Sequence, residues 1–223
     1  MSDIIEQFAA IVDTNGILRG DDVSSRAVHV WNDASIEAQV ILRPTSTEQV
    51  AAIMKICHAA NQPVVAHGGR TGLVQSSISV AGDVVLSLER MNHIEEVDEI
   101  GRTMTVQAGV PLQQIQDVAD EKNLFFPVDL GARGSCHIGG NVSTNAGGNR
   151  VVRFGMMRDN ILGLEVVLAD GTVISSLNTM IKNNAGYDLK QLFIGTEGTL
   201  GIVTRVVLRL REALPKDETA FVA

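Results

Sequence analysis

Hydrophobic side chains recur along the chain with two spacings, one of three or four residues and one of two residues or short continuous runs. The first spacing predicts amphipathic helices, and the second predicts strands. Three helices are expected, and their apolar faces hold Ile4, Ile5, Phe8, Ile11 and Val12; Val50, Ile53, Met54 and Cys57; and Leu112, Ile115, Val118 and Ala119. Helix starts are expected at a cap on Ser2 or Asp3, at a capping box of Thr45 and Glu48, and at Pro111 in a first turn.

The second spacing predicts strands over 38–42, 63–66, 83–88, 103–108, 164–169, 172–174 and 201–210. The order of strand 38–42, helix and strand 63–66 predicts two parallel strands. Asp170 and Gly171 separate two strands and predict a type I′ hairpin turn. In the last strand, Val206, Leu208 and Leu210 share one face. The pattern as a whole predicts a mixed α+β fold.

Composition narrows the class of protein. The 223 residues are 45% hydrophobic, which is enough for a real core, and the length permits one large domain or two small ones. A net charge of −8 argues against a nucleic-acid partner, because the phosphate backbone would be repelled. Two cysteines give no disulfide framework, and there is no basic leader or integral membrane segment. We therefore expect a soluble, cytoplasmic protein.

Three glycine-rich stretches follow ends of predicted elements. The run 134–148 carries five glycines and short polar side chains, and we expect it to be too glycine-rich for a stable helix. The loop 67–72 follows a strand and can present consecutive amides to a phosphate, although it fits neither the Rossmann nor the P-loop pattern. A third loop spans 195–201. Each alone could be a decorated surface loop or a tight turn, but one extended polar ligand would account for all three.

Three motifs in fixed order carry a resemblance to a known family: 130–148, 162–172 and 187–201. Over roughly Ala38 to Leu210, the chain resembles the PCMH-type FAD-binding domain of the vanillyl-alcohol oxidase and para-cresol methylhydroxylase superfamily of flavoproteins. Within it, the chain is similar to D-2-hydroxyglutarate dehydrogenases and their D-lactate dehydrogenase relatives. The resemblance implies two α+β subdomains, a small βαβ-containing sheet and a larger mixed or antiparallel sheet with flanking helices.

The resemblance also implies that FAD is the cofactor and that its contacts come from all three loops. The residues implied are Ala66, His67, Gly68, Gly69, Arg70, Thr71, Gly72, Asp129, Gly134, Ser135, His137, Gly139, Gly140, Asn141, Thr144, Asn145, Ala146, Gly147, Glu197, Gly198, Gly201, Ile202 and Val203. Family members with covalent flavin have a histidine directly after the paired glycines, where this chain has Arg70, so we expect non-covalent FAD. We also expect Gly69→Val to block FAD binding and leave the fold intact.

Other single residues have simpler interpretations. His29, His58 and His93 lack metal-ligand spacing, and we expect no metal site. Tyr187 could hydrogen-bond near the cofactor or lie in the core. Cys57 and the pair Met156 and Met157 are interpreted as packing residues.

The resemblance divides the chain into an N-terminal helical extension (1–37), an FAD-binding domain (38–211, with subdomains of roughly 38–100 and 101–211) and the start of a linker (212–223) to a missing substrate domain. Two functions are then open. The first is the FAD-binding portion of a D-2-hydroxy acid dehydrogenase of the D-lactate, D-2-hydroxyglutarate or glycolate type, with hydride transfer to flavin N5. The second is an FAD-binding subunit with no turnover of its own. The catalytic base, the acid, the electron acceptor and the oligomeric state are not identified by the sequence.

Overall fold

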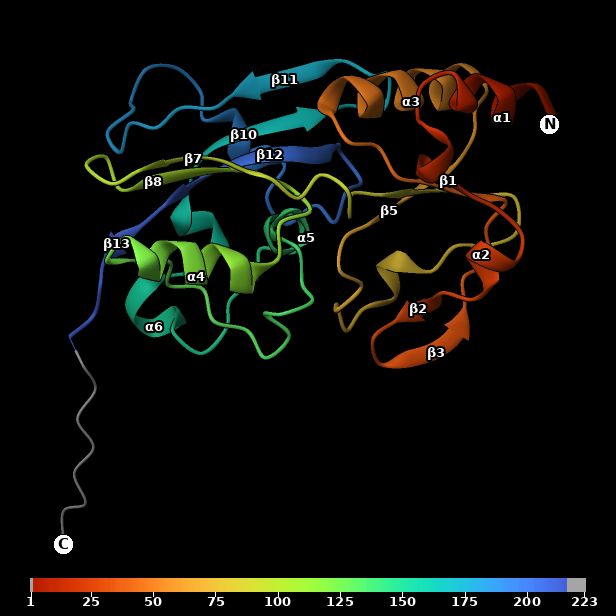
Figure 1. Ribbon diagram of the computed structural model, residues 1–223. Helices are drawn as coiled ribbons and strands as arrows, with labels where there is room; N and C mark the ends of the chain where they lie inside the picture. The colour runs from red at the N-terminus through yellow and green to blue at the C-terminus, as the bar shows by residue number, and fades with distance from the viewer. Residues whose placement is uncertain (1, 216–223) are drawn as a thin grey trace, which may run out of the picture.

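A four-stranded sheet forms the N-terminal part of the molecule. The computed structural model describes residues 2–215, and in it this sheet has the order β1-β4-β6-β5 (Figure 1). The strands are β1 (Ile17–Leu18), β4 (Val40–Leu42), β6 (Val84–Ser87) and β5 (Val64–His67). β4, β6 and β5 are parallel, and α3 (Thr47–Ala59) connects β4 to β5. The predicted parallel arrangement is confirmed, with β6 between the two predicted strands.

A five-stranded antiparallel sheet forms the second layer, in the order β11-β10-β12-β8-β7. Its strands are β11 (Val173–Ser176), β10 (Ile161–Val167), β12 (Ile202–Arg209), β8 (Thr103–Gln107) and β7 (Ile94–Asp98). The helices α4 (Leu112–Glu121), α5 (Ile138–Ser143) and α6 (Val151–Phe154) lie below this sheet in Figure 1. α3 packs against β10, so this helix touches both sheets.

Short elements complete the fold. They are α1 (Ser2–Ala9), α2 (Asp21–Ser24), β2 (Ala27–His29), β3 (Asn32–Ser35), β9 (Leu124–Phe125), β13 (Arg211–Glu212) and the 3₁₀ turns η1 (Thr14–Gly16), η2 (Gln75–Ser77), η3 (Met157–Asn160) and η4 (Leu189–Leu192). The N-terminal segment is therefore not only helical, because β1 joins the first sheet and β2 pairs with β3. β1, β2, β3, β9 and β13 have only two to four residues and were not predicted from the hydrophobic pattern. The side chains of Ser2 and Asp3, and residues 216–223 of the expected linker, lie outside the described structure.

One buried cluster joins the two sheets. It includes Val40 and Val84 from the first sheet, Val206 and Leu208 from the second, and Cys57 from α3. The core position predicted for Cys57 is confirmed, and burial raises the pKa of its thiol to about 11. Because the core is continuous, the edges where the two sheets meet are held in fixed relation to each other.

Two local predictions differ from the structure. The N-cap of α3 is Ser46, whose hydroxyl accepts from the backbone N–H of Gln49, while Gln49 Oε1 accepts from the N–H of Thr45. The reciprocal pair is thus shifted by one residue from Thr45 and Glu48. At the hairpin of β10 and β11, only Gly171 has a positive φ of 84°, whereas a type I′ turn needs two such residues. The loop is one residue longer than predicted, with Leu168 donating to the carbonyl of Thr172.

Candidate functional site

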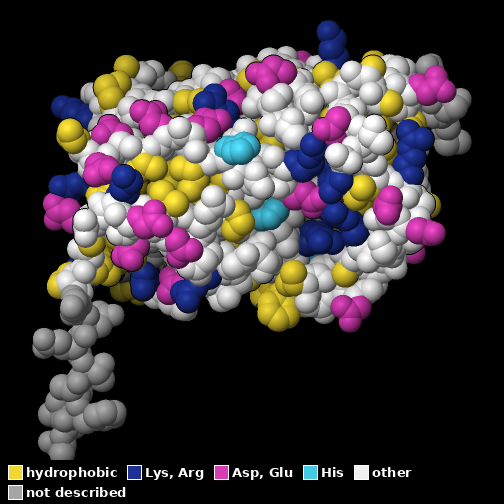
Figure 2. Space-filling model, viewed as in Figure 1, with side chains coloured by type: hydrophobic (Ala, Val, Ile, Leu, Met, Phe, Trp, Pro, Cys, Tyr) yellow, Lys and Arg dark blue, Asp and Glu magenta, His cyan; other side chains and the backbone are white. Residues whose placement is uncertain are grey.

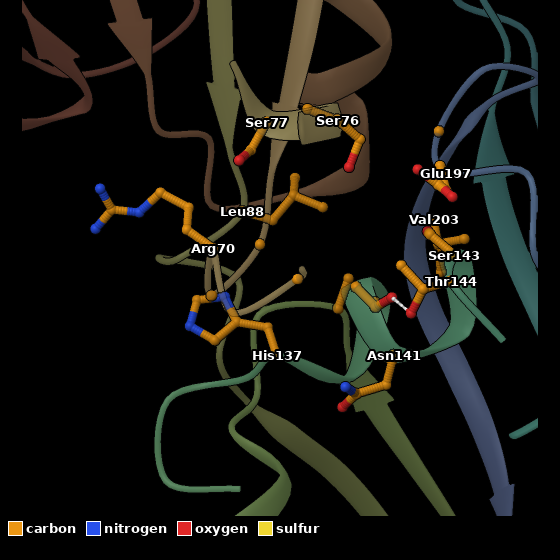
Figure 3. A pocket seen from close by; sticks show the side chains of 18 of the residues that line it. Arg70, Ser76, Ser77, Leu88, His137, Asn141, Ser143, Thr144, Glu197 and Val203 are labelled. Atoms are coloured by element: carbon orange, nitrogen blue, oxygen red, sulfur yellow. Dashed lines mark hydrogen bonds between the residues drawn. The ribbon is translucent and has the colours of Figure 1, made fainter. Parts of the chain in front are cut away.

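One pocket lies where the two sheets meet, beyond the carboxyl end of β5 and beside the start of β12 (Figure 3). Most of the predicted cofactor-binding residues line it, namely Ala66, Gly68, Gly69, Arg70, Thr71, Gly72, His137, Gly139, Gly140, Asn141, Thr144, Glu197, Gly198, Gly201, Ile202 and Val203. The three glycine loops, far apart in the sequence, therefore come together around a single cavity. Crevices at strand ends are common ligand sites in α/β proteins.

The first loop leaves β5 and turns at residues 68–72. In the part of the chain that the structure describes, no hydrogen bond is donated by the backbone N–H groups of Gly69, Arg70, Thr71 and Gly72. Unpaired consecutive amides are expensive unless water or a ligand satisfies them, and such a set forms an anion-binding nest. The carbonyl of Arg70 accepts from the N–H of Val30, which fixes the loop against β2.

Gly69 has a packing role that the sequence did not reveal. A Cβ at this position would lie 1.9 Å from the carbonyl oxygen of Ser135 and 2.8 Å from Cα of Cys136. Both atoms belong to backbone, which cannot move aside as a flexible side chain could. The expectation that Gly69→Val leaves the fold intact is therefore wrong, because the valine would separate two packed loops.

The glycine-rich run 134–148 contains the helix α5, contrary to the expectation that it is too rich in glycine. Ile138 and Val142 are fully buried, and their packing offsets the low helix propensity of the glycines. The N–H of Gly139 donates to the carbonyl of Ala108, and a Cβ on Gly139 would lie 2.6 Å from the Ala108 side chain. A Cβ on Gly140 would meet nothing within 4 Å. Gly139 thus allows close packing, whereas Gly140 leaves space in the pocket.

The third loop is fastened to the end of α5. The N–H of Glu197 donates to the carbonyl of Ser143, and that of Gly195 donates to Val142. Arg158 supports the loop from behind, since its guanidinium donates to the carbonyls of Gln191 (3.0 Å) and Ile194 (2.6 Å). These contacts place Glu197 and Gly198 opposite the first loop.

Two buried polar atoms on the pocket wall have no hydrogen-bond partner among the described residues. They are Nδ1 of His137 and Oδ1 of Asn141. Burial lowers the pKa of His137, so the imidazole is held neutral near pH 7. Buried polar atoms are nearly always paired in native proteins, and these two residues face a cavity. Together with the open space at Gly140 and the amide nest, they fit a large polar ligand such as FAD.

Seven predicted residues lie outside the lining: His67, Asp129, Gly134, Ser135, Asn145, Ala146 and Gly147. His67 is buried, and its Nε2–H donates to the carbonyl of Ser77 over 2.8 Å. Asn145 Oδ1 accepts from the N–H of Arg158, and Asp129 pairs with Arg133 and Arg150. These residues support the walls of the pocket from outside.

Sequence reasoning missed other lining residues: His29, Ser76, Ser77, Leu88, Ala108, Cys136 and Ser143. Cys136 and Ser143 lie inside the second glycine run, so that run itself was an available signal. His29 and Ser77 are 48 residues apart, and only the fold brings Nε2 of His29 within 2.9 Å of the Ser77 hydroxyl.

The remaining single residues lie away from this pocket. Tyr187 is 95% exposed, so the core position considered for it is wrong, and it is not among the residues that line this pocket. Met157 is fully buried as predicted, whereas Met156 is partly exposed. Within the described residues, no three His, Cys, Asp or Glu side chains are arranged to hold a metal ion. No helix in that part of the chain is long and apolar enough to cross a membrane.

Comparison with known proteins identifies the protein family to which the chain belongs. Residues 38–176 match the family described as FAD binding domain. The chain belongs to this family, and FAD is its cofactor. The chain is similar to the mitochondrial D-2-hydroxyglutarate dehydrogenase of Danio rerio, with 47% identity over 89% of the chain and 37% of the relative. It is also similar to the D-2-hydroxyglutarate dehydrogenase of Xanthomonas citri pv. viticola, with 45% identity over 82% of the chain and 39% of the relative.

Among solved structures, alkyldihydroxyacetonephosphate synthase superposes with a TM-score of 0.83 over 95% of this chain and 40% of that chain. The sequence identity is 19%, so the likeness concerns the fold alone. It confirms the predicted α+β architecture. The chain spans about 40% of the length of the Oryza sativa relative that matches it from end to end at 43% identity.

Proposed function

We propose that the chain is the FAD-binding part of a flavin-dependent dehydrogenase that oxidises a D-2-hydroxy acid. The main support is its 43% to 48% identity to proteins named D-2-hydroxyglutarate dehydrogenase. A related protein of Schizosaccharomyces pombe is named a putative D-lactate dehydrogenase, so D-lactate is a second candidate substrate. The names of these relatives make D-2-hydroxyglutarate the first candidate substrate.

The residues of this chain bind and orient the cofactor in this proposal. The amides of residues 69–72 hold the diphosphate, and the space beside Gly140 admits the flavin portion. His137 Nδ1 accepts from a cofactor N–H or O–H group, as does Asn141 Oδ1, which removes the cost of leaving both atoms unpaired. Leu88 and Ala108 keep water from this wall. When bound, FAD would accept a hydride from the substrate carbon.

The proposal includes non-covalent attachment. Arg70 stands where covalent relatives have histidine, and Nε2 of the nearby His67 is engaged with the carbonyl of Ser77. Acid precipitation of the loaded protein should leave a colourless pellet and release all FAD into the supernatant. A yellow pellet would show a covalent bond.

The relatives differ in the localisation that their names give. The Danio rerio and Oryza sativa relatives are named as mitochondrial, and the Xanthomonas citri relative is not. The expectation of a cytoplasmic protein is therefore too simple.

Anaerobic mixing of the FAD-loaded protein with D-2-hydroxyglutarate, L-2-hydroxyglutarate and D-lactate tests the proposed activity. The assay is run on the chain and on the longest natural protein that contains it, with the flavin absorbance followed in each. We expect the longer form to be bleached by D-acids only, and the chain alone to bind FAD without turnover, because a covering domain is needed to position the acid. A longer form that holds FAD and is reduced by no D-acid would support the FAD-binding subunit instead.

A further inference from the structure

A second cavity lies between the hairpin of β10 and β11 and the segment that follows β11. It shares no lining residue with the cofactor pocket. Figure 1 shows this segment extending beyond the end of β11, on the side of the molecule opposite β2 and β3. The cavity has a volume of about 200 Å³. Because an apolar cavity of roughly 150 Å³ can hold benzene, this one has room for a molecule with a single ring.

The floor of the cavity is apolar. In the antiparallel pairing, Leu164 of β10 is opposite Ser176 of β11. Val166 is likewise opposite Ile174, so both pairs lie on one face of the hairpin. Phe193, directly after η4, also lines the cavity. Leu164, Val166 and Phe193 are buried, so a molecule on this floor would meet aliphatic and aromatic carbon.

The rim of the cavity offers hydrogen-bond donors without a net charge. Asn178 and Asn183 line it, and each Oδ1 accepts from a backbone N–H, at 2.9 Å and 3.3 Å. Neither Nδ2 group donates to another atom of the described chain, so both remain available. The ammonium of Lys190 bonds to both carboxylate oxygens of Asp188 at 2.7 Å, so these two charges cancel. An uncharged acceptor oxygen, such as that of a carbonyl group, suits this rim.

The segment 177–186 is held by few hydrogen bonds. Among the described residues its only two are those accepted by Asn178 and Asn183, and both stay within the segment. Met180, Ile181 and Tyr187 are exposed, and Figure 2 shows hydrophobic side chains on the surface where Figure 1 places this segment. A long connection without secondary structure is often a binding loop, and one with so few bonds opens at low cost.

We propose that this cavity binds a compact neutral molecule that has an apolar ring and a carbonyl oxygen. The ring lies on Leu164, Val166 and Phe193, and the oxygen accepts from Nδ2 of Asn178 or Asn183. The exposed apolar side chains of the neighbouring segment then cover the ligand. The site is separate from the cofactor pocket, and its existence does not depend on the proposed function.

The test uses acetophenone as the probe, because it has one ring and one carbonyl group. Ethylbenzene is the matched control, since it has nearly the same shape and no oxygen. Each is titrated into the isotope-labelled chain saturated with FAD, which occupies the first pocket, and the backbone amides are followed by NMR. We expect saturable shifts in residues 162–166 and 173–193, with acetophenone bound about fivefold more tightly than ethylbenzene. The same shifts are expected without FAD.

Three variants locate the site. Ser176→Phe adds a ring on the cavity face of β11 at an exposed position, and it should remove the saturable shifts. Val173→Phe adds the same ring on the opposite face of that strand, outside the cavity lining, and should bind acetophenone as the wild type does. Asn178→Ala combined with Asn183→Ala should make acetophenone bind no better than ethylbenzene.

Three results would overturn the inference. They are an absence of saturable shifts in 162–193 of the wild type, unchanged binding by Ser176→Phe, and equal affinity of the wild type for both probes. The amide spectrum of each variant shows whether it is folded. The double asparagine variant, changed only in the loop, tests the site even if Ser176→Phe does not fold, and unchanged discrimination between the probes in it would also contradict the proposal.

Discussion

Neighbouring glycines in one pocket wall lack a side chain for different reasons. Gly139 allows α5 to touch Ala108, and Gly69 allows two loops to touch, so added atoms at either position meet the protein itself. Gly140 faces open space, so added atoms there meet the ligand instead. The sequence assigned all three to cofactor binding because spacing alone cannot separate these two functions.

Adjacent substitutions in α5 should therefore have opposite effects. Gly139→Ala should lower the free energy of unfolding by about 1–3 kcal/mol, because its methyl group overlaps Ala108. Gly140→Val should leave stability within about 0.5 kcal/mol of the wild type, since valine and glycine have similar helix propensities. The same valine should abolish FAD binding. Urea unfolding and FAD titration of both variants, with Gly131→Val outside the pocket as control, would check this.

A buried histidine gives the fold a particular acid sensitivity. Burial lowers the pKa of His67 to about 4, so the folded state keeps the ring neutral while the unfolded state takes up a proton below about 6.5. Stability is therefore lost as the pH falls from about 6.5 towards 4, by about 2 kcal/mol between pH 7 and pH 5. His67→Gln should remove this part of the pH dependence in urea unfolding. An equal pH dependence in both proteins would contradict the assignment.

At the scale of elements, the hydrophobic pattern predicted α1, α3, α4 and the seven strands β4, β5, β6, β8, β10, β11 and β12, but it missed α5, β7 and the strands β1, β2, β3, β9 and β13. The stripe of Leu112, Ile115 and Ala119 is fully buried in α4, as predicted. α5 has no comparable local signal, because it forms through burial of Ile138 and Val142 against elements far away in the sequence. The contact of His29 with Ser77 likewise depends on β2 and η2 being brought together by the fold.

We expect Arg158 to keep the third glycine loop in one ordered conformation. Its guanidinium satisfies carbonyls of Gln191 and Ile194, just before Gly195. Arg158→Met should leave these carbonyls unpaired, which costs about 1–3 kcal/mol, and should speed amide exchange in 189–201. FAD affinity should fall as well. Lys190→Met, which removes a pair with Asp188 in the same segment, should change exchange little.

At the scale of the whole molecule, the continuous core makes the two sheets one unit. Residues of both sheets contact each other in the buried cluster, and α3 packs against both. The described chain should therefore unfold in a single calorimetric transition in spite of its two sheets. FAD should raise the midpoint of that transition, because only the folded pocket binds it. Two separate transitions would contradict a shared core.

Direct titration of the cofactor-free chain with FAD tests the central claim. Trp31, the single tryptophan, lies between β2 and β3 and follows Val30, whose N–H donates to the carbonyl of Arg70 in the first loop, so its fluorescence can be followed during the titration. We expect saturation at one FAD per chain, full release of FAD on acid precipitation, and no saturable binding by Gly140→Val. Absence of saturable binding by the wild type, or equal affinity in Gly140→Val, would contradict it.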